Sequence, residues 1–256
     1  DGLDLHPLLQ EAKRQLHEEA DYLLEARHLR RFAVALQESP EFLVPGVDEH
    51  FTRRNILAMD FLEGEPIESL VTATQATRDR VAGLLLELFF RELFEFGMIQ
   101  TDPNFANFLY NSGTRQLGLL DFGATRRYPA AVIEAYRGLL EAALCEDHEA
   151  MSASAQAIGY FKEDIHAQQR TAVMKLFVLA TEPARTRGCF DFGASDLAVR
   201  IRDAGMALGL DQGYWHTPPA DAIFLHRKLG GLYLLAAHLR AKVDVRIILE
   251  RYLHHE

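Results

Sequence analysis

Residues 98–129, MIQTDPNFANFLYNSGTRQLGLLDFGATRRYP, decide the fold. Two short apolar runs, Phe108–Tyr110 and Leu117–Leu120, are separated by polar and turn-forming residues and predict a small β-hairpin. Polar residues flank both runs: Asp102 and Asn107 precede the first, and Asp121 follows the second. Two acids and an amide just outside a hairpin predict a polar site beside it.

The spacing of these three residues is typical of phosphoryl transfer from ATP. Asp102 and Asn107 form a D-x-x-x-x-N pattern, and Asp121 begins D-F-G fourteen residues after Asn107. The reaction needs a carboxylate that orients or deprotonates the attacking oxygen, and oxygen ligands for magnesium. We therefore predict that Asp102 is the catalytic carboxylate and that Asn107 and Asp121 hold Mg²⁺, with Phe122 packed inward.

Each of these patterns is weak when it stands alone. Asp-Pro opens turns, asparagine caps them, and D-F-G arises by chance. A second copy lies at Asp191–Gly193, where it follows no apolar strand and no D-x-x-x-x-N precedes it at hairpin distance. We interpret that copy as part of a loop or a helix entry. For the first copy, the spacing, the strand context and the upstream helix all favour a functional role.

Upstream of the quoted stretch, helix and strand patterns alternate. Apolar residues recur at mostly helical spacing after Pro7, which predicts one long helix over about residues 5–37. FLVPGV (42–47) and NILAMDF (55–61) are predicted strands, and the segment Asp60–Pro66 is a candidate lobe boundary. An amphipathic helix over about 77–96 then ends at Gly97.

From Ala130 onward the apolar pattern is helical. The predicted helices span about residues 130–145, 148–158, 163–180, 194–208, 220–239 and 243–254. The order along the chain is a helix, two strands, a helix, a polar loop with its hairpin, and then many helices. This order indicates a mostly helical α+β fold.

Composition argues against several classes of function. The 256-residue chain has a net charge of −10, whereas a grip on the nucleic-acid backbone needs a surplus of lysine and arginine. Cys145 and Cys189 form no C-x-x-C pair, so a zinc cluster or a disulfide scaffold is not expected. No apolar run approaches the roughly 20 residues that span a bilayer. The chain starts with Asp1 rather than Met, so we expect a piece of a longer protein.

The combined motifs resemble the UbiB-type family of atypical, protein-kinase-like proteins, which is linked to ubiquinone biosynthesis. QTDPNFANFLY (100–110) and LGLLDFGATRRY (117–128) are similar to the family's catalytic and metal loops, in a form nearer its mitochondrial-type coenzyme Q branch. EEADYLLEA (18–26) resembles its Glu-x-Asp helix motif. LHRKLGGLYLL (225–235) and FDFG (190–193) resemble its helical C-terminal part.

The resemblance covers nearly the whole chain, from about Glu18 to Tyr252. It implies a two-lobed protein-kinase-like α+β fold. An incomplete N-lobe, with a long helix and two strands, is expected over residues 1–62, and an enlarged helical C-lobe with the catalytic loop and the D-F-G hairpin over 63–256.

The resemblance also implies a role for each residue of the site. Asp102 is the catalytic-loop aspartate, Asn107 and Asp121 hold magnesium, and Glu25 pairs with a lysine that touches the phosphates of ATP. The remaining implied residues are an acidic pair that helps to fill the peptide pocket, Glu19 and Asp21; the gatekeeper, Met59; and the two residues whose backbones face adenine, Asp60 and Leu62.

The cofactors implied by the resemblance are ATP and Mg²⁺. The implied partners are the nucleotide, a quinone-precursor lipid and other ubiquinone-biosynthesis proteins, without nucleic acid. The expected location is the cytoplasm or the membrane periphery, on the matrix side if the protein is mitochondrial, because no spanning segment is present in the sequence.

The chain departs from the kinase pattern in two regions. Ahead of Glu25 it has no glycine-rich or alanine-rich loop, no V-A-I-K-like strand and no Lys-x-Gly-Gln motif, and we expect these elements upstream of residue 1. After Asp121 it has no Ala-Pro-Glu, because Pro129 and a helical pattern follow almost at once. A peptide-binding activation segment is therefore not expected.

Two alternative functions remain open at this point. One is a catalytically silent module that uses nucleotide as a conformational ligand. The other is an aminoglycoside- or choline-type phosphotransferase, which shares the D-x-x-x-x-N pattern. Gln100, Thr101 and Asn104 argue against the second alternative, because that loop more often has His-Gly-Asp followed by a histidine.

Overall fold

The computed structural model describes residues 21–102, 104–161, 165–210 and 219–253. The helices, in chain order, are α2 (Tyr22–Ala35), α3 (Gln75–Arg91), α4 (Ala130–Leu144), α5 (His148–Ile158), α6 (Ala167–Ala180), α7 (Glu182–Arg185), α8 (Leu197–Leu210), α9 (Ala220–His238) and α10 (Val245–Leu253). The strands are β1 (Phe42–Leu43), β2 (Glu65–Pro66), β3 (Met98–Gln100), β4 (Phe108–Asn111), β5 (Gln116–Leu119), β6 (Thr125–Arg127), β7 (Phe190–Asp191) and β8 (Lys242–Val243).

A four-stranded sheet with the order β1-β5-β4-β2 is built around the predicted hairpin. In its centre β4 and β5 pair antiparallel, with Phe108 opposite Leu119 and Asn111 opposite Gln116. Strand β1 adds to the β5 edge in parallel, and β2 adds to the β4 edge antiparallel. A separate pair, β3 with β6, brackets the polar loop and the D-F-G segment. The hairpin prediction is therefore confirmed.

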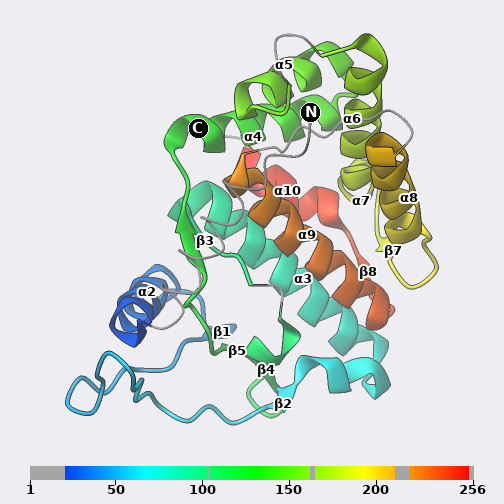
Figure 1. The fold of residues 1–256 in the computed structure, drawn as a ribbon. Helices are drawn as coiled ribbons and strands as arrows, with labels where there is room; N and C mark the ends of the chain where they lie inside the picture. The colour runs from blue at the N-terminus through cyan, green and yellow to red at the C-terminus, as the bar shows by residue number, and fades with distance from the viewer. Residues whose placement is uncertain (1–20, 103, 162–164, 211–218, 254–256) are drawn as a thin grey trace.

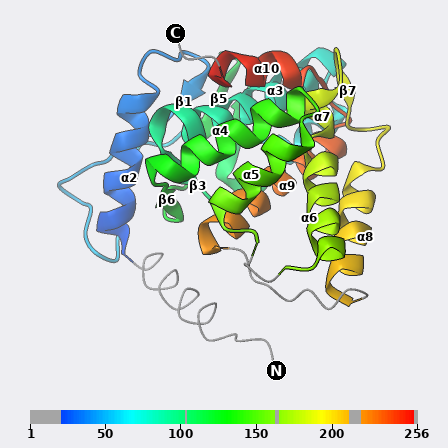
Figure 2. The ribbon, with the colours of Figure 1, turned by 90° about the horizontal axis from the view of Figure 1, so that it is seen from above.

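The helices surround this small sheet unevenly. Helices α3, α9 and α10 run close to one another beside the sheet, and α4 to α8 gather beyond them, away from the sheet (Figure 1). Seen from above, α2 lies on one flank of the molecule and α6 and α8 lie on the opposite flank (Figure 2). The molecule is thus mostly helical, and the small sheet lies toward the α2 side.

The predicted helix over 77–96 is confirmed, with one irregularity. Helix α3 starts at Gln75, directly after its N-cap Thr74, whose hydroxyl accepts a hydrogen bond from the N–H of Thr77. Its last turn widens to a π-helix over Glu92–Phe96, and Gly97 ends it in the left-handed conformation, with φ of 60°. Left-handed φ favours glycine, so the sequence marks this end correctly.

The prediction of one continuous helix over residues 5–37 is wrong at Asp21. The backbone of Asp21 is not helical, and its carboxylate accepts hydrogen bonds from the N–H groups of Leu23 and Leu24. An aspartate in this position satisfies the N–H groups that start a helix. Helix α2 therefore begins at Tyr22, and the rest of the predicted helix, residues 5–20, lies outside the described residues.

The predicted strand over 55–61 is also wrong, because this segment belongs to a loop that is closed by its own hydrogen bonds. The Asp48 carboxylate accepts from the N–H groups of His50 and Phe51, and the Thr52 hydroxyl bonds both backbone groups of Ala58. Only isolated bridges form here, at Ile56 and Met59. Ile56 and Phe61 are exposed, and none of the described strands covers the segment.

The helices predicted after Ala130 agree with the structure at nearly all boundaries. A four-residue helix, α7, and the short strand pair β7–β8 were not predicted. The second D-F-G lies at this strand pair: Asp191 forms an ion pair with Lys242, Nζ to Oδ2 3.0 Å, and Phe192 is buried against Tyr233. This copy is structural and leads into α8, as the sequence indicates.

One aromatic contact joins α2 to the first D-F-G segment. Phe32 on α2 and Phe122 are both buried, with ring centroids 4.6 Å apart. Phe122 therefore packs inward, as predicted. Helix α2 lies on the flank of the molecule, and this contact packs it against the D-F-G segment.

Phe32→Ala should lower the free energy of unfolding by about 3–5 kcal/mol, because it leaves a cavity against Phe122. The matched control is Val34→Ala on the same helix, since Val34 is 66% exposed and its truncation should change little. Urea unfolding of the two variants measures the difference. Equal effects would contradict the assignment of Phe32 as the contact that holds α2.

Candidate active site

Asp102, Asn107 and Asp121 converge on one point beside the hairpin. The Asn107 Nδ2 lies 2.9 Å from Oδ2 of Asp102 and 3.4 Å from Oδ2 of Asp121. Asp102 follows β3, Asn107 directly precedes β4 and Asp121 follows β5, so three different strand ends bring the side chains together. The convergence that the spacing predicts is present.

Backbone and side-chain hydrogen bonds hold the two loops in register. The N–H of Leu120 donates to the Asn107 carbonyl, 3.0 Å, and both the N–H and the hydroxyl of Thr101 donate to the Ala124 carbonyl, at 3.0 and 2.7 Å. The Asp121 carboxylate accepts from the N–H of Gly123 at 2.8 Å. These hydrogen bonds therefore join the polar loop to the D-F-G segment.

The Asn107 amide presents its NH₂ group to two carboxylates. Mg²⁺ binds oxygen ligands, so its binding here would require the amide to turn and present its oxygen. A carboxamide is nearly the same shape in both orientations, so this turn needs no backbone movement. With the amide turned, the Asn107 and Asp121 oxygens can serve as ligands of one ion, and these residues fit magnesium.

Glu25 brings a third carboxylate to this site from α2. Its side chain is buried, and Oε1 accepts from the N–H of Phe122 at 3.4 Å. Burial, together with the negative charge of Asp121, raises the pKa of Glu25 to about 7. Among the described residues none supplies a cation within ion-pair distance of Glu25. Its neighbour His28 is also bound to this loop, with Nδ1 3.1 Å from the Phe122 carbonyl.

The predicted hinge residues lie between the 48–58 loop and the sheet. Asp60 donates its N–H to the Gly46 carbonyl, 2.9 Å, and its carboxylate accepts from the N–H of Gly46, 3.0 Å. In the part of the chain that the structure describes, no protein group bonds the Asp60 carbonyl or the Leu62 N–H. These two groups form the acceptor and donor pair that could face an adenine edge. Met59 is partly exposed beside them.

The structure describes only one residue of the predicted acidic pair. Asp21 is the N-cap of α2 and uses one carboxylate oxygen for that purpose. Glu19 lies outside the described residues. Their joint role at a peptide pocket stays a prediction.

Sequence reasoning missed two basic residues on α9. Arg227 places a guanidinium nitrogen 3.7 Å from Oδ1 of Asp102. Lys228, the next residue, is buried, with Nζ 2.9 Å from Oε2 of Glu92 and 3.2 Å from Oε1 of Gln100. Gln100 ends β3, two residues before Asp102. Helix α9 thus contacts the catalytic loop through both side chains. The resemblance of residues 225–235 to the family's C-terminal part does not indicate these contacts.

A family model described as the ABC1 atypical kinase-like domain matches residues 1–155. The chain belongs to this family. Among its relatives, the atypical kinase COQ8 of Saccharomyces cerevisiae is 35% identical over 94% of the chain, and the atypical kinase COQ8B of Rattus norvegicus is 32% identical over 99% of it. Both alignments cover 48% of the relative, so the chain spans about half the length of these curated relatives.

A solved structure, that of the Rv3197–erythromycin complex from Mycobacterium tuberculosis, has a similar fold. It matches with a TM-score of 0.75 and 21% sequence identity, over 97% of this chain and 62% of the other. This likeness concerns the fold alone. Together with the family match, it confirms the predicted kinase-like α+β fold, while the division into lobes at residue 62 stays a prediction.

Lys228→Met should lower the free energy of unfolding by about 3–5 kcal/mol near pH 8, because it leaves a buried Glu92 carboxylate without its cation. Burial already raises the pKa of Glu92 to about 7 against the opposing charge of Lys228, and loss of the cation raises it further. In both proteins the folded state binds this proton more tightly than the unfolded state, so both lose stability in parallel up to about pH 7. The loss caused by the substitution therefore grows only above the pKa of Glu92 in the unmodified protein, from about pH 7 to 9. Urea unfolding across this range measures it.

Two control variants accompany this measurement. Lys228→Met combined with Glu92→Leu should recover most of the stability, because no buried charge remains. Arg246→Met breaks a partly exposed pair with Glu250 and should cost only about 0–1 kcal/mol. A loss for Lys228→Met that does not depend on pH would contradict an ionised Glu92 as its cause.

Proposed function

We propose that this chain is the catalytic part of an atypical kinase that binds Mg–ATP and transfers the γ-phosphoryl group to water or to a small, lipid-like acceptor. The observation that carries the proposal is the convergence of Asp102, Asn107 and Asp121 within hydrogen-bond distance of a single amide. Two acids and an amide at strand ends match the needs of a reaction that is catalysed by positioning and charge.

Each residue then has one task. Asp102 orients the attacking oxygen and accepts its proton, and Asn107 and Asp121 provide the oxygens that hold magnesium. The Asp60 carbonyl and the Leu62 N–H face adenine, beside Met59. Magnesium, when bound, neutralises charge on the phosphates. The buried Glu25 carboxylate is placed for a lysine partner of the phosphates, as the family resemblance implies.

The acceptor in this proposal is small rather than a protein. Strand β6 ends at Arg127 and α4 begins at Ala130, so only two residues separate the metal-loop strand from the next helix. A segment this short leaves no platform for a peptide. The acidic pair Glu19 and Asp21 would further disfavour acidic peptides by charge repulsion.

The setting of the proposed reaction follows from the relatives. Their names describe mitochondrial atypical kinases, and the UbiB-type resemblance connects such proteins with ubiquinone biosynthesis. We place the protein in that pathway, with a quinone-precursor lipid and other pathway proteins as partners at the membrane periphery, on the matrix side if mitochondrial. None of the described helices is long and apolar enough to cross a bilayer.

One observation favours a silent nucleotide-binding module as the second candidate. Both oxygens of Asp102 already face partners: Oδ2 accepts from Asn107, and Oδ1 lies 3.7 Å from the Arg227 guanidinium. A carboxylate whose two oxygens both have partners must give up one of these contacts before it can orient an attacking oxygen. Turnover therefore has to be measured separately from binding.

Asp102→Asn should reduce phosphate release from Mg–ATP by about 10²-fold or more and leave nucleotide affinity nearly unchanged, because it removes the proton acceptor alone. Asp121→Asn should instead weaken the magnesium dependence of nucleotide binding. Phosphate release and calorimetric titration of the purified protein, with and without liposomes that carry quinone precursors, measure the two effects.

The chain offers a matched control in its second D-F-G. Asp191→Asn changes the same residue in the same tripeptide, but Asp191 pairs with Lys242 on the surface strand pair, so activity should be retained. Binding without turnover in the unmodified protein would favour the silent module. Efficient phosphorylation of peptides would refute the small-acceptor proposal.

A further inference from the structure

The helical part of the molecule contains a partly open cavity of about 430 Å³. Helices α3, α4, α6, α8 and α9 contribute its walls, and its lining includes Phe89, Leu139, Val173, Phe177, Leu225 and Tyr233. Among the described residues that line it, none is an aspartate, glutamate, lysine or arginine. Residues Asp102, Asn107 and Asp121 are not among its lining residues, so the proposed phosphotransfer does not account for it.

A small neutral polar cluster lies on the cavity wall. The hydroxyls of Tyr136 and Tyr160 are 3.1 Å apart, and the Tyr160 hydroxyl is 2.9 Å from Nε2 of His226. Desolvation by the helices packed around His226 lowers the pKa of its imidazole, so the ring is uncharged at neutral pH. Much of its surface is nevertheless accessible, because it faces the cavity. The wall thus offers hydrogen bonds without offering charge.

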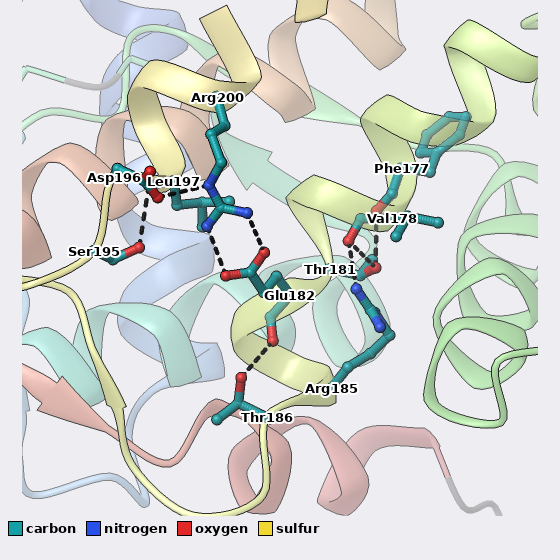
Figure 3. Close-up of polar contacts among 10 residues, drawn as sticks. All are labelled: Phe177, Val178, Thr181, Glu182, Arg185, Thr186, Ser195, Asp196, Leu197 and Arg200. Carbon is teal, nitrogen blue, oxygen red and sulfur yellow. Dashed lines mark hydrogen bonds and ion pairs between the residues drawn. The ribbon is translucent and has the colours of Figure 1, made fainter.

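Polar contacts fix the helices at one side of the cavity. Arg200 on α8 forms two parallel bonds with the Glu182 carboxylate on α7, at 2.7 and 2.8 Å, as Figure 3 shows. In the same view the Thr181 hydroxyl donates to the Phe177 carbonyl at 2.8 Å, and Arg185 donates to the Val178 carbonyl at 2.9 Å. These contacts hold α6, α7 and α8 in place, so the space between them is not free to collapse.

Glycines keep part of the wall open. Gly205 on α8 and Gly230 on α9 both line the cavity, and a Cβ built on either would meet no atom within 4 Å. A Cβ at either position would therefore point into open space. An empty apolar cavity destabilises a protein in proportion to its volume, so a molecule that filled this one would stabilise the fold.

We propose that this cavity is a binding site for a neutral amphiphile, a molecule with a hydrocarbon body and one uncharged oxygen group. The apolar wall would bind the hydrocarbon, and the Tyr160 and His226 groups would bond the oxygen. An apolar cavity of about 150 Å³ holds benzene, and this one is about three times larger, so it admits a body of roughly three rings or a medium-length chain. A charged ligand is disfavoured, because its charge would lose water without gaining a counter-ion from the described lining residues.

The test uses N-phenyl-1-naphthylamine, a neutral probe of suitable size whose fluorescence rises in apolar surroundings. The probe should bind saturably, and 1-dodecanol should displace it, whereas dodecanoate, which differs by its charge, should displace it about tenfold less well or worse. Tyr160→Phe keeps the shape of the wall and removes the hydroxyl, so it should weaken displacement by the alcohol more than binding of the probe.

A cavity-filling variant makes the assignment specific. Gly230→Phe should weaken probe binding by about tenfold or more, whereas Gly230→Ala should bind as the unmodified protein does, because it adds one carbon in open space. Both substitutions replace a glycine inside α9 with a better helix former, so both variants should keep at least the Tm of the unmodified protein. Phe51→Ser removes an exposed aromatic side chain from the 48–58 loop and should leave binding unchanged.

Two results would overturn the proposal. Equal probe binding by Gly230→Phe and Gly230→Ala, with both folded, would show that the probe does not occupy the cavity. Equal displacement by dodecanol and dodecanoate would show that the site does not select against charge. Neither measurement involves nucleotide, so the outcome is independent of the proposed phosphotransfer.

Discussion

The structure is organised around an electrostatic constraint: Glu25, Asp102 and Asp121 meet at one place, and the amide of Asn107 lies between two of them. Like charges this close repel one another, and burial together with Asp121 raises the pKa of Glu25 to about 7. A site of this kind is stabilised by cations. The surrounding fold supplies one directly, the Arg227 guanidinium beside Asp102, and leaves the Asn107–Asp121 side suited to magnesium.

Local pattern was sufficient to predict the hairpin and the helix before it. The apolar runs at 108–110 and 117–120 form the paired strands, and Gly97 ends its helix because that residue needs a left-handed backbone. Prediction failed where one polar side chain decides the backbone. The Asp21 carboxylate starts a new helix inside a continuous helical pattern, and Asp48 closes a loop next to residues with strand-forming composition. A helical or alternating pattern describes which face is apolar, not which side chain bonds the backbone.

The candidate site also contains residues that the sequence predicts and residues that it does not. Asp102, Asn107 and Asp121 lie within twenty residues of one another, so spacing alone predicts that they meet. Arg227 and Lys228 lie more than a hundred residues downstream, and a basic pair on an amphipathic helix resembles a solvated face. The two D-F-G tripeptides illustrate the limit. Their difference comes from their partners, since Asp121 faces an asparagine and Asp191 a lysine.

Helix α9 contacts the catalytic loop, a buried ion pair and the cavity, because three of its consecutive residues face three different environments. His226 faces the apolar cavity, Arg227 reaches Asp102, and Lys228 is buried against Glu92 and Gln100. Successive residues of a helix point about 100° apart, so this arrangement exists for only one rotation of α9 about its axis. A rotation of α9 by one residue, about 100°, would move Lys228 away from Glu92. The buried Glu92 carboxylate would then be unpaired, at a high free-energy cost. The buried ion pair therefore fixes the helix that carries Arg227 to the catalytic loop and His226 to the cavity.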